Sequence, residues 1–141
     1  MTDKAIRSFS VRLRVPFYHV DPMQVVWHGN YFKYFEAARD ALLESVGIDL
    51  ESFYTSHKYV FPVVRGSVKF IHPLRYKDVF LCTAKVMEIR RKIVIGYDIK
   101  LASTNTLCTT GSTEQVVLKM PEAEIEFKVP EEILRAIGHS P

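Results

Sequence analysis

Cysteines and long apolar runs are both scarce in this sequence, and each scarcity excludes a class of protein. The 141 residues include only two cysteines, Cys82 and Cys108, which are far apart and fit no CxxC or other metal-like spacing. We therefore expect two buried, reduced thiols. No apolar stretch has the ~18 residues that a membrane-spanning helix requires, and the N-terminal residues lack the apolar segment of a signal peptide. These absences predict a cytoplasmic protein without a membrane span.

Long runs of like charge are missing too. The formal net charge is +3, the pI is near 8.9, and the densest basic group is only Arg90-Arg91-Lys92. A small anionic ligand fits this pattern better than nucleic acid, which usually binds a broad basic face. The sequence also contains no repeat, low-complexity segment or linker. With 48% hydrophobic and 25% charged residues, the chain is predicted to form one globular domain over residues 1–141.

The spacing of apolar residues predicts one long helix. Apolar residues recur at helical spacing over residues 31–46 and form a continuous stripe. Asn30 precedes this segment, and we expect its side chain to cap the helix by accepting a backbone hydrogen bond. Gly47 follows the segment and can adopt the left-handed conformation that ends a helix. A stripe this apolar must pack against another element.

Alternating and β-branched segments predict strands on both sides of this helix. One strand precedes the helix and four follow it, and short connections make consecutive strands antiparallel. One helix packed on one curved antiparallel sheet is an α+β sandwich. The predicted strands are residues 9–17, 62–72, 78–90, 92–103 and 107–120, with a helical turn at 50–54, a short apolar segment at 125–127 and a short helix at 131–137.

The stretch with the most chemistry runs from His19 to Tyr31. It places Asp21, two histidines and the start of the helix within thirteen residues. A carboxylate can act as nucleophile or general base, and the unpaired N–H groups of a helix N-terminus can polarise a carbonyl oxygen. Asp21 precedes Pro22 and could instead be an ordinary turn residue. A metal site built from His19, Asp21 and His28 is weakly indicated, because a fourth ligand is missing.

The same stretch resembles a known family signature. The signature consists of an aspartate, a valine-aromatic pair and a tyrosine that enters the helix, and it is similar to that of the 4-hydroxybenzoyl-CoA thioesterase family and related short-chain acyl-CoA thioester hydrolases. The resemblance covers residues 8–135 and implies the hot-dog fold, an α+β fold in which a five- to six-stranded curved antiparallel sheet wraps around one long central helix. The elements that carry the resemblance are Asp21-Pro22, Val26-Trp27, Asn30-Tyr31, Glu36-Ala37-Ala38-Arg39, the hairpin 88–92 and the segment 129–132.

This resemblance implies hydrolysis of an acyl- or aroyl-CoA thioester to the free acid and CoA. Asp21 would be the nucleophile or the general base, and the backbone N–H of His28 would polarise the thioester carbonyl. No cofactor and no metal are implied. Arginine and lysine side chains are suited to the phosphates of CoA. The substrate-binding residues would be Trp27, Tyr31, Arg90, Arg91 and Lys92.

Several alternatives remain open in the sequence. Many relatives have Ala-Gly-Gly after the aspartate, whereas this chain has Pro22-Met23-Gln24, so the acyl group is not determined. The side chain of His28 could donate a proton or line a pocket. Glu36 fits a helix-surface position, and His72 fits a structural one. The alternative functions are an acyl-carrier-protein thioesterase and a non-catalytic acyl-CoA-binding or assembly module of the same fold.

The expected fold also predicts self-association. One helix covers only one face of the sheet, so strand 107–120 and the apolar residues of the outer face need cover or a partner. The resemblance implies a homo-oligomer, either a dimer with a continuous sheet or a homotetramer, with sites between the subunits. Basic residues of one chain could then serve Asp21 of another.

Overall fold

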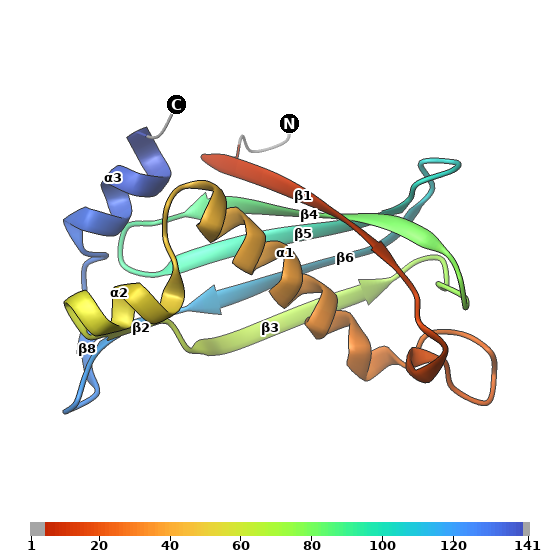
Figure 1. The fold of residues 1–141 in the computed structure, drawn as a ribbon, viewed down its shortest axis with the longest axis horizontal. Helices are drawn as coiled ribbons and strands as arrows, with labels where there is room; N and C mark the ends of the chain where they lie inside the picture. Colours follow the sequence, from red (N-terminus) through yellow and green to blue (C-terminus); the bar gives the residue numbers. More distant parts are fainter. Residues whose placement is uncertain (1–4, 140–141) are drawn as a thin grey trace.

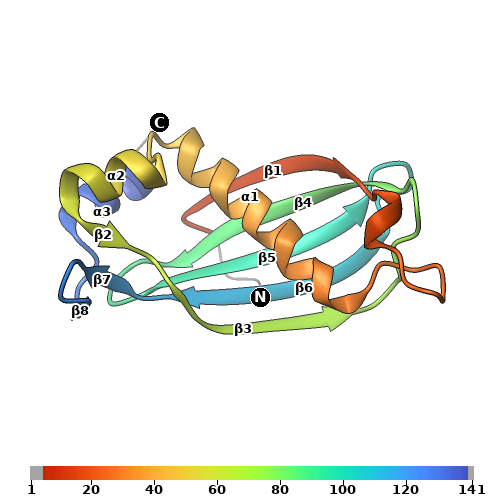
Figure 2. The same cartoon turned by 60° about the horizontal axis from the view of Figure 1, so that its bottom comes forward.

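A computed structural model describes residues 5–139 of the protein. One long helix packs along one face of a five-stranded antiparallel sheet with the strand order β1-β4-β5-β6-β3 (Figure 1). A smaller sheet, β2-β7-β8, and two short helices lie together at one end (Figure 2). The elements are β1 (Arg7–Arg14), α1 (Tyr31–Ser45), α2 (Leu50–His57), β2 (Tyr59–Val60), β3 (Val63–Phe70), β4 (Val79–Glu88), β5 (Ile93–Leu101), β6 (Leu107–Gln115), β7 (Val117–Lys119), β8 (Glu124–Glu126) and α3 (Glu131–His139).

Helix α1 packs on the sheet through the apolar stripe that the sequence predicts. The ring of Phe35 stacks on Tyr97 of β5, with 4.4 Å between the ring centroids. Gly111 of β6 leaves room for Phe35, because a β-carbon at position 111 would lie 2.5 Å from that ring. Burial of one such side chain contributes roughly 1.5–3 kcal/mol, so the stripe fixes α1 on the sheet. The buried residues of α1 are Tyr31, Tyr34, Phe35, Ala38, Leu42 and Leu43.

The start of α1 differs from the sequence prediction. A 3-10 turn, His28–Asn30, leads directly into α1, so helical backbone begins three residues earlier than expected. Asn30 is itself helical and makes no side-chain cap; its amide instead donates a hydrogen bond of 3.0 Å to the carbonyl of His19. The predicted cap is therefore wrong, because the tertiary contact to His19 uses the side chain. The predicted stop is confirmed, since Gly47 has a φ of +83°.

All five predicted strands are shorter in the structure, and two of them end in a way that the sequence did not indicate. The first ends at Arg14, and Phe17 lies in a short 3-10 turn, Phe17–His19, with 74% of its side chain exposed. The predicted strand 107–120 is split at Val116, whose N–H donates to the carbonyl of Pro62. Beyond that point the chain leaves the main sheet and pairs with β2 and β8. A change of hydrogen-bonding partner therefore breaks a segment whose β-branched residues favour one continuous strand.

The α+β hot-dog arrangement is confirmed, and it determines which surfaces stay open. Helix α1 lies on one face of the sheet, and β1 and β3 are the edge strands. Strand β3 is exposed along almost its whole length, including Val63, Val64 and Phe70. Within residues 5–139, no helix combines the length and the apolar character needed to cross a membrane.

Candidate active site

The loop before α1 is a tight turn that holds the carboxylate of Asp21. The N–H of Asp21 donates to the carbonyl of Val25, and the N–H of Gln24 donates to the carbonyl of Asp21. One carboxylate oxygen of Asp21 accepts a hydrogen bond of 2.8 Å from the N–H of Met23. Asp21 is therefore a turn residue, as one of the two interpretations of the sequence predicted. The second carboxylate oxygen of Asp21 accepts no hydrogen bond from the described residues.

A second set of bonds ties this loop to the segment after β3. The N–H of Val26 donates to the carbonyl of Leu74 at 2.8 Å, and Val25 forms a bridge with Arg75. Because Leu74 is fully buried, the loop is anchored to the core rather than hanging in solvent. Two segments that are about fifty residues apart in sequence therefore share one end of the molecule.

These segments enclose a cavity of about 260 Å³ that contains both Asp21 and His28. The cavity also receives His72, for which the sequence indicated only a structural role. Histidine before a proline in a strand-to-loop segment gives no functional signal in sequence, so only the fold could reveal this neighbour. The lining residues are Asp21, Val25, Val26, His28, Tyr31, Phe70, Ile71, His72 and Pro73.

His28, which lines the same cavity, stands at the start of the helical backbone. His28 and Gly29 open the 3-10 turn that continues into α1, so their N–H groups have no carbonyl within the helix to bond. The helix dipole adds partial positive charge at this end. A carbonyl oxygen placed beside the turn would therefore be polarised in the manner of an oxyanion hole.

The two aromatic residues predicted to bind substrate have different surroundings. Tyr31 is 3% exposed and lines the cavity, and burial raises the pKa of its hydroxyl. Its hydroxyl is therefore protonated at neutral pH. Trp27 does not line the cavity; half of its side chain is exposed and its ring lies over Gly29, where a β-carbon would approach the ring to 2.1 Å. Trp27 covers the turn from outside.

Arg90, Arg91 and Lys92 do not lie near Asp21 within one chain. Strand β4 begins beside Arg14, close to the Asp21 loop, and ends at Glu88, next to the basic hairpin. Ten residues at ~3.3 Å each place the two ends roughly 30 Å apart. Lys92 also forms an ion pair of 2.8 Å with Glu114, which lowers the pKa of that carboxyl group.

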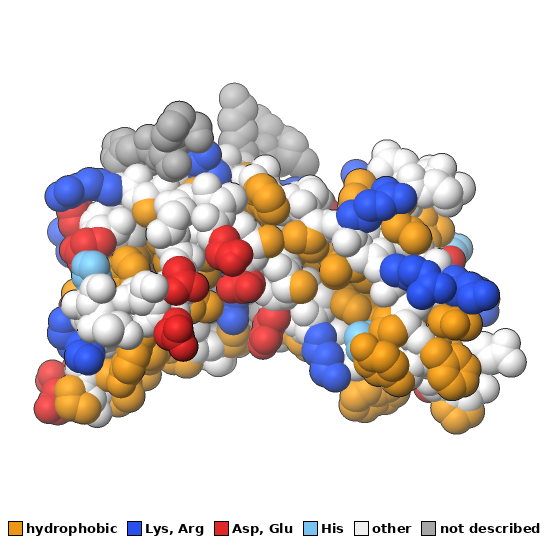
Figure 3. All heavy atoms as spheres, viewed as in Figure 1, with side chains coloured by type: hydrophobic (Ala, Val, Ile, Leu, Met, Phe, Trp, Pro, Cys, Tyr) orange, Lys and Arg blue, Asp and Glu red, His pale blue; other side chains and the backbone are white. Residues whose placement is uncertain are grey.

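A different basic group lies beside the loop and was not singled out from the sequence. Arg75 and Tyr76 line a second hollow, of about 470 Å³, which shares Asp21 with the first cavity. Arg14 and Lys77 both lie over the ring of Tyr76, at 5.7 and 5.3 Å from its centroid. Lysine and arginine side chains gather at this end, on the right of Figure 3. The three cations come from two separate segments, so no basic run marks them in sequence.

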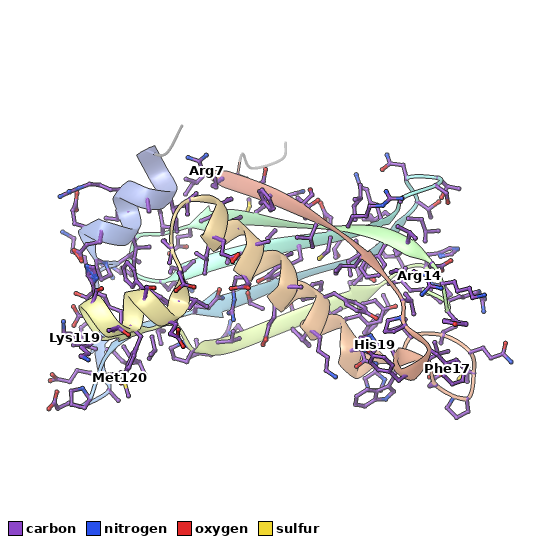
Figure 4. All side chains as sticks on the ribbon, in the orientation of Figure 1. Arg7, Arg14, Phe17, His19, Lys119 and Met120 are labelled. Carbon is purple, nitrogen blue, oxygen red and sulfur yellow. The ribbon has the colours of Figure 1, made fainter. Side chains whose placement is uncertain are left out.

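Two remaining candidates are not part of the cavity. Glu36 is exposed on α1 and does not line it. His19 accepts or donates a hydrogen bond of 2.7 Å at Nδ1 with the hydroxyl of Tyr34, and burial, then the charge of Lys33, lower the pKa of His19. Figure 4 shows His19 beside Phe17 at the loop end, opposite the end that carries Lys119. No group of three potential metal ligands occurs within the part of the chain that the structure describes.

Comparison with known proteins gives a consistent result. Residues 23–108 match the family described as the Thioesterase superfamily. A protein of Aquifex aeolicus (strain VF5), named as a candidate esterase, is 35% identical over 104 residues, which are 70% of this chain and 80% of that protein. A 1,4-dihydroxy-2-naphthoyl-CoA hydrolase of Rippkaea orientalis (strain PCC 8801 / RF-1) is 28% identical over 100 residues, with 70% and 72% covered.

A solved structure supports the same fold. A 4-hydroxybenzoyl-CoA thioesterase mutant complexed with 4-hydroxybenzoyl-CoA superposes with a TM-score of 0.84, at 19% identity, over 93% of this chain and 99% of the other. The match of more than half the chain to one family, together with this fold, identifies the class of enzyme. This chain belongs to the Thioesterase superfamily and is a hot-dog-fold thioester hydrolase.

Proposed function

We propose that the protein hydrolyses an acyl- or aroyl-CoA thioester to the free acid and CoA, with Asp21 as the catalytic carboxylate. One observation carries this proposal: Asp21 and the N-terminal turn of α1 at His28 line the same cavity. A thioester carbonyl in that cavity would have a carboxylate on one side and backbone donors on the other. The relatives named as CoA thioester hydrolases support the choice of CoA. We expect this activity in the cytoplasm.

The chemistry divides between the two groups. In one route a carboxylate oxygen of Asp21 attacks the carbonyl carbon, the CoA thiolate leaves, and water then cleaves the mixed anhydride. In the other route the carboxylate takes a proton from water as that water attacks. In both, the N–H of His28 stabilises the negative charge on the carbonyl oxygen. The hydrogen bond from Met23 holds one carboxylate oxygen and so orients the other.

Four further side chains complete the proposed site. We assign to Tyr31, protonated and buried at the cavity wall, a hydrogen bond donated to the substrate. The side chains of His28 and His72 line the cavity and face the same space. The leaving thiolate is a weak base, so these histidines are assigned to binding rather than to proton transfer. Trp27 shields the turn and borders the entry of the thioester.

We propose further that two chains pair through β3 and complete each other's sites. A strand edge with exposed Val63, Val64 and Phe70 is a surface that another strand can extend. Antiparallel pairing of two β3 strands sets the hairpin end of one chain beside the Asp21 end of the other. The hairpin with Arg90 and Arg91 would then lie on the same side as the partner's cavity. This arrangement, as a dimer or a homotetramer, would give both cationic groups access to CoA phosphates.

The central test is the Asp21→Asn variant. The amide oxygen can still accept from the N–H of Met23, so the turn is kept while the charge and the nucleophile are lost. Across short aliphatic, long aliphatic and aromatic CoA thioesters, assayed by released thiol, kcat is expected to fall by a factor of about 10²–10⁴. Undiminished turnover by Asp21→Asn would remove Asp21 from the mechanism.

Two comparisons separate this function from its rivals. Turnover rates on thioesters of CoA and of acyl carrier protein with the same acyl group show which carrier the enzyme uses. Faster turnover of the carrier-protein thioester would overturn the CoA assignment. A complete absence of thiol release with every thioester would favour a binding module instead. Label on Asp21 after a single turnover in water enriched in oxygen-18 would establish the anhydride route, because only attack of water on the aspartyl carbonyl of the anhydride transfers that oxygen to Asp21.

The proposed assembly has its own test. Sedimentation at several protein concentrations is expected to show a dimer or a tetramer. Placing a charge on the β3 edge, as in Val64→Lys, is expected to shift the protein toward monomer. A wild-type protein that sediments as a monomer would contradict the shared site.

A further inference from the structure

A second cavity lies at the opposite end of α1 and has a different character. Its volume is about 200 Å³, and it is closed off by the end of α1, the residues after it, the β2 region and α3. Apolar side chains make up nearly all of the wall. The lining residues are Arg39, Leu43, Ile48, Leu50, Val60, Phe61, Ile93, Ile95, Gln115 and Ile133.

One polar side chain in this wall lacks a partner. Gln115 is 1% exposed, and neither its Nε2 nor its Oε1 has a hydrogen-bond partner among the described residues. An unsatisfied buried polar group costs roughly 1–3 kcal/mol, so such groups need an explanation. Thr113, on the same face of β6, shows the usual solution, because its hydroxyl bonds to the hydroxyl of Tyr97 at 2.9 Å. Gln115 instead presents a free amide to the cavity.

A cation lies in the same wall. Arg39 is half-buried on α1, one helical turn before Leu43, and both line the cavity. Burial raises the pKa of Tyr97 on β5 to about 12, and the positive charge of Arg39 lowers it in part, so Arg39 lies near β5. None of the ion pairs within the described residues involves Arg39. The cavity therefore has an apolar body and two lining residues, Arg39 and Gln115, whose side chains can donate hydrogen bonds.

We propose that this cavity binds a small apolar monocarboxylate. The carboxylate would accept hydrogen bonds from the guanidinium of Arg39 and from Nε2 of Gln115, an arrangement that suits the geometry of arginine. Apolar cavities of about 150 Å³ admit benzene, so about 200 Å³ suits an aromatic or branched body of roughly six to eight non-hydrogen atoms. A neutral alcohol would leave the guanidinium unpaired, and an apolar molecule would leave both groups unpaired.

The proposed site is separate from the cavity at Asp21. Tyr31 of one cavity and Arg39 of the other are eight residues apart on α1, which is about 12 Å at ~1.5 Å per residue, and the two cavities share no lining residue. Free carboxylic acids are also the class of product that a thioester hydrolase releases, so a product could occupy this second site. The binding itself does not depend on the proposed role of Asp21.

The test uses benzoate as the probe, with titration calorimetry for affinity and amide chemical shifts for location. Benzoate is expected to shift Ile95, Gln115 and Ile133, and to bind at least tenfold more tightly than benzyl alcohol or toluene. Gln115→Leu, which is nearly isosteric, and Arg39→Gln are each expected to weaken benzoate binding at least tenfold. Lys33→Gln, which removes a cation of α1 outside the cavity, is the matched control and is expected to bind benzoate normally.

Several outcomes would overturn this assignment. Equal affinity for benzoate and toluene would make the cavity an apolar void with no polar recognition. Shift changes confined to His28 and His72, or loss of binding in Asp21→Asn, would place benzoate in the other cavity. The shift map of the wild-type protein decides the location even if Gln115→Leu fails to fold. Unchanged benzoate affinity in folded Gln115→Leu and Arg39→Gln would also refute the site.

Discussion

The two ends of α1 carry cavities of similar size and opposite chemistry. The N-terminal cavity, about 260 Å³, is lined by Asp21, His28 and His72, and it is built from loops. The C-terminal cavity, about 200 Å³, is lined almost entirely by aliphatic side chains, and it is covered by short helices. The same helix serves both. Its N-terminus supplies positive partial charge and open donors, whereas its last turns supply apolar side chains.

The polar groups of the two ends are treated differently. At the N-terminal end the chain satisfies one oxygen of Asp21 with the N–H of Met23 and keeps the other exposed to the cavity. At the C-terminal end the amide of Gln115 is buried with no partner among the described residues. The carboxylate of Asp21 is thus held in place by a hydrogen bond, whereas the amide of Gln115 is left unpaired. The difference fits the two proposals, in which Asp21 must be oriented for a reaction and Gln115 must be free to bind a ligand.

The sharpest way to break this comparison is to remove the donor at the N-terminal end. Proline at position 28 deletes the backbone N–H, and the site tolerates it, because His28 is the first residue of the turn and Trp27 is extended (φ −61°, ψ 134°). His28→Pro is expected to lower kcat by a factor of about 10²–10³. His28→Ala keeps the N–H and is the control, measured in the same thioester assay. Equal losses in both variants would assign the effect to the side chain instead.

At the C-terminal end the corresponding change should stabilise the fold. Gln115→Leu replaces an unsatisfied amide with an apolar group of similar size, so the free energy of unfolding is expected to rise by about 1–2 kcal/mol. Gln115→Ala removes the amide but enlarges the cavity, and should be less stable than Gln115→Leu by about 1–3 kcal/mol. Urea denaturation of the three proteins measures both differences. A Gln115→Leu protein less stable than wild type would show that the amide is satisfied in solution.

A third test removes, in two separate variants, the basic residues beside the Asp21 loop and those of the hairpin between β4 and β5. Arg75→Ala with Lys77→Ala removes the group beside Asp21, and Arg90→Ala with Arg91→Ala removes the hairpin group. If the hollow at Arg75 holds the CoA phosphates, the first pair is expected to raise KM about tenfold, since exposed ion pairs contribute up to about 1 kcal/mol each. The effect should shrink at high salt. An increase confined to the Arg90 and Arg91 variant would instead support binding by a neighbouring subunit.

The smallest expected effect concerns His19, at the loop end. Burial, and then the charge of Lys33, lower the pKa of this histidine below its ordinary 6.5, and its Nδ1 pairs with the hydroxyl of Tyr34. His19 therefore binds a proton more readily in the unfolded chain than in the folded protein. Its contribution to the free energy of unfolding is complete above pH 6.5 and is lost as the pH falls through the lower pKa of the folded state. His19→Gln should reduce this dependence, measured as Tm above and below pH 6.5. An identical pH profile would assign the dependence to other groups.

Much of the fold was predictable because it depends on local patterns. The helical stripe that contains Phe35 and Leu42, the stop at Gly47 and the alternating segments of β4 and β5 all appear where their periodicity indicates. Two of the predictions that were wrong share one cause. Asn30 donates to His19 instead of capping, and the strand through Val116 changes its pairing partner. In both places a contact distant in sequence outweighs the local preference.

The candidate site divides in the same way. Asp21 and His28 were predictable because they are close in sequence and precede a helix. His72 and Arg75 were not, since a hydrogen bond between Val26 and Leu74 brings their segment to the loop. The hairpin at Arg90 had the composition of a phosphate site, but the length of β4 separates it from Asp21 in one chain. The composition of a segment therefore indicates a type of ligand, but the positions of two segments along the strands decide whether their side chains lie close together.

The sequence by itself therefore determined the α+β class, the helix, and the pairing of a carboxylate with a helix N-terminus, because these depend on residues within a few turns of each other. Only the tertiary structure decided which strand is the open edge, which histidine joins Asp21, and that Gln115 faces an apolar cavity without a partner. These features arise where distant segments pack. Their physical basis is the hydrogen bonding and burial that each residue obtains only after the chain has folded.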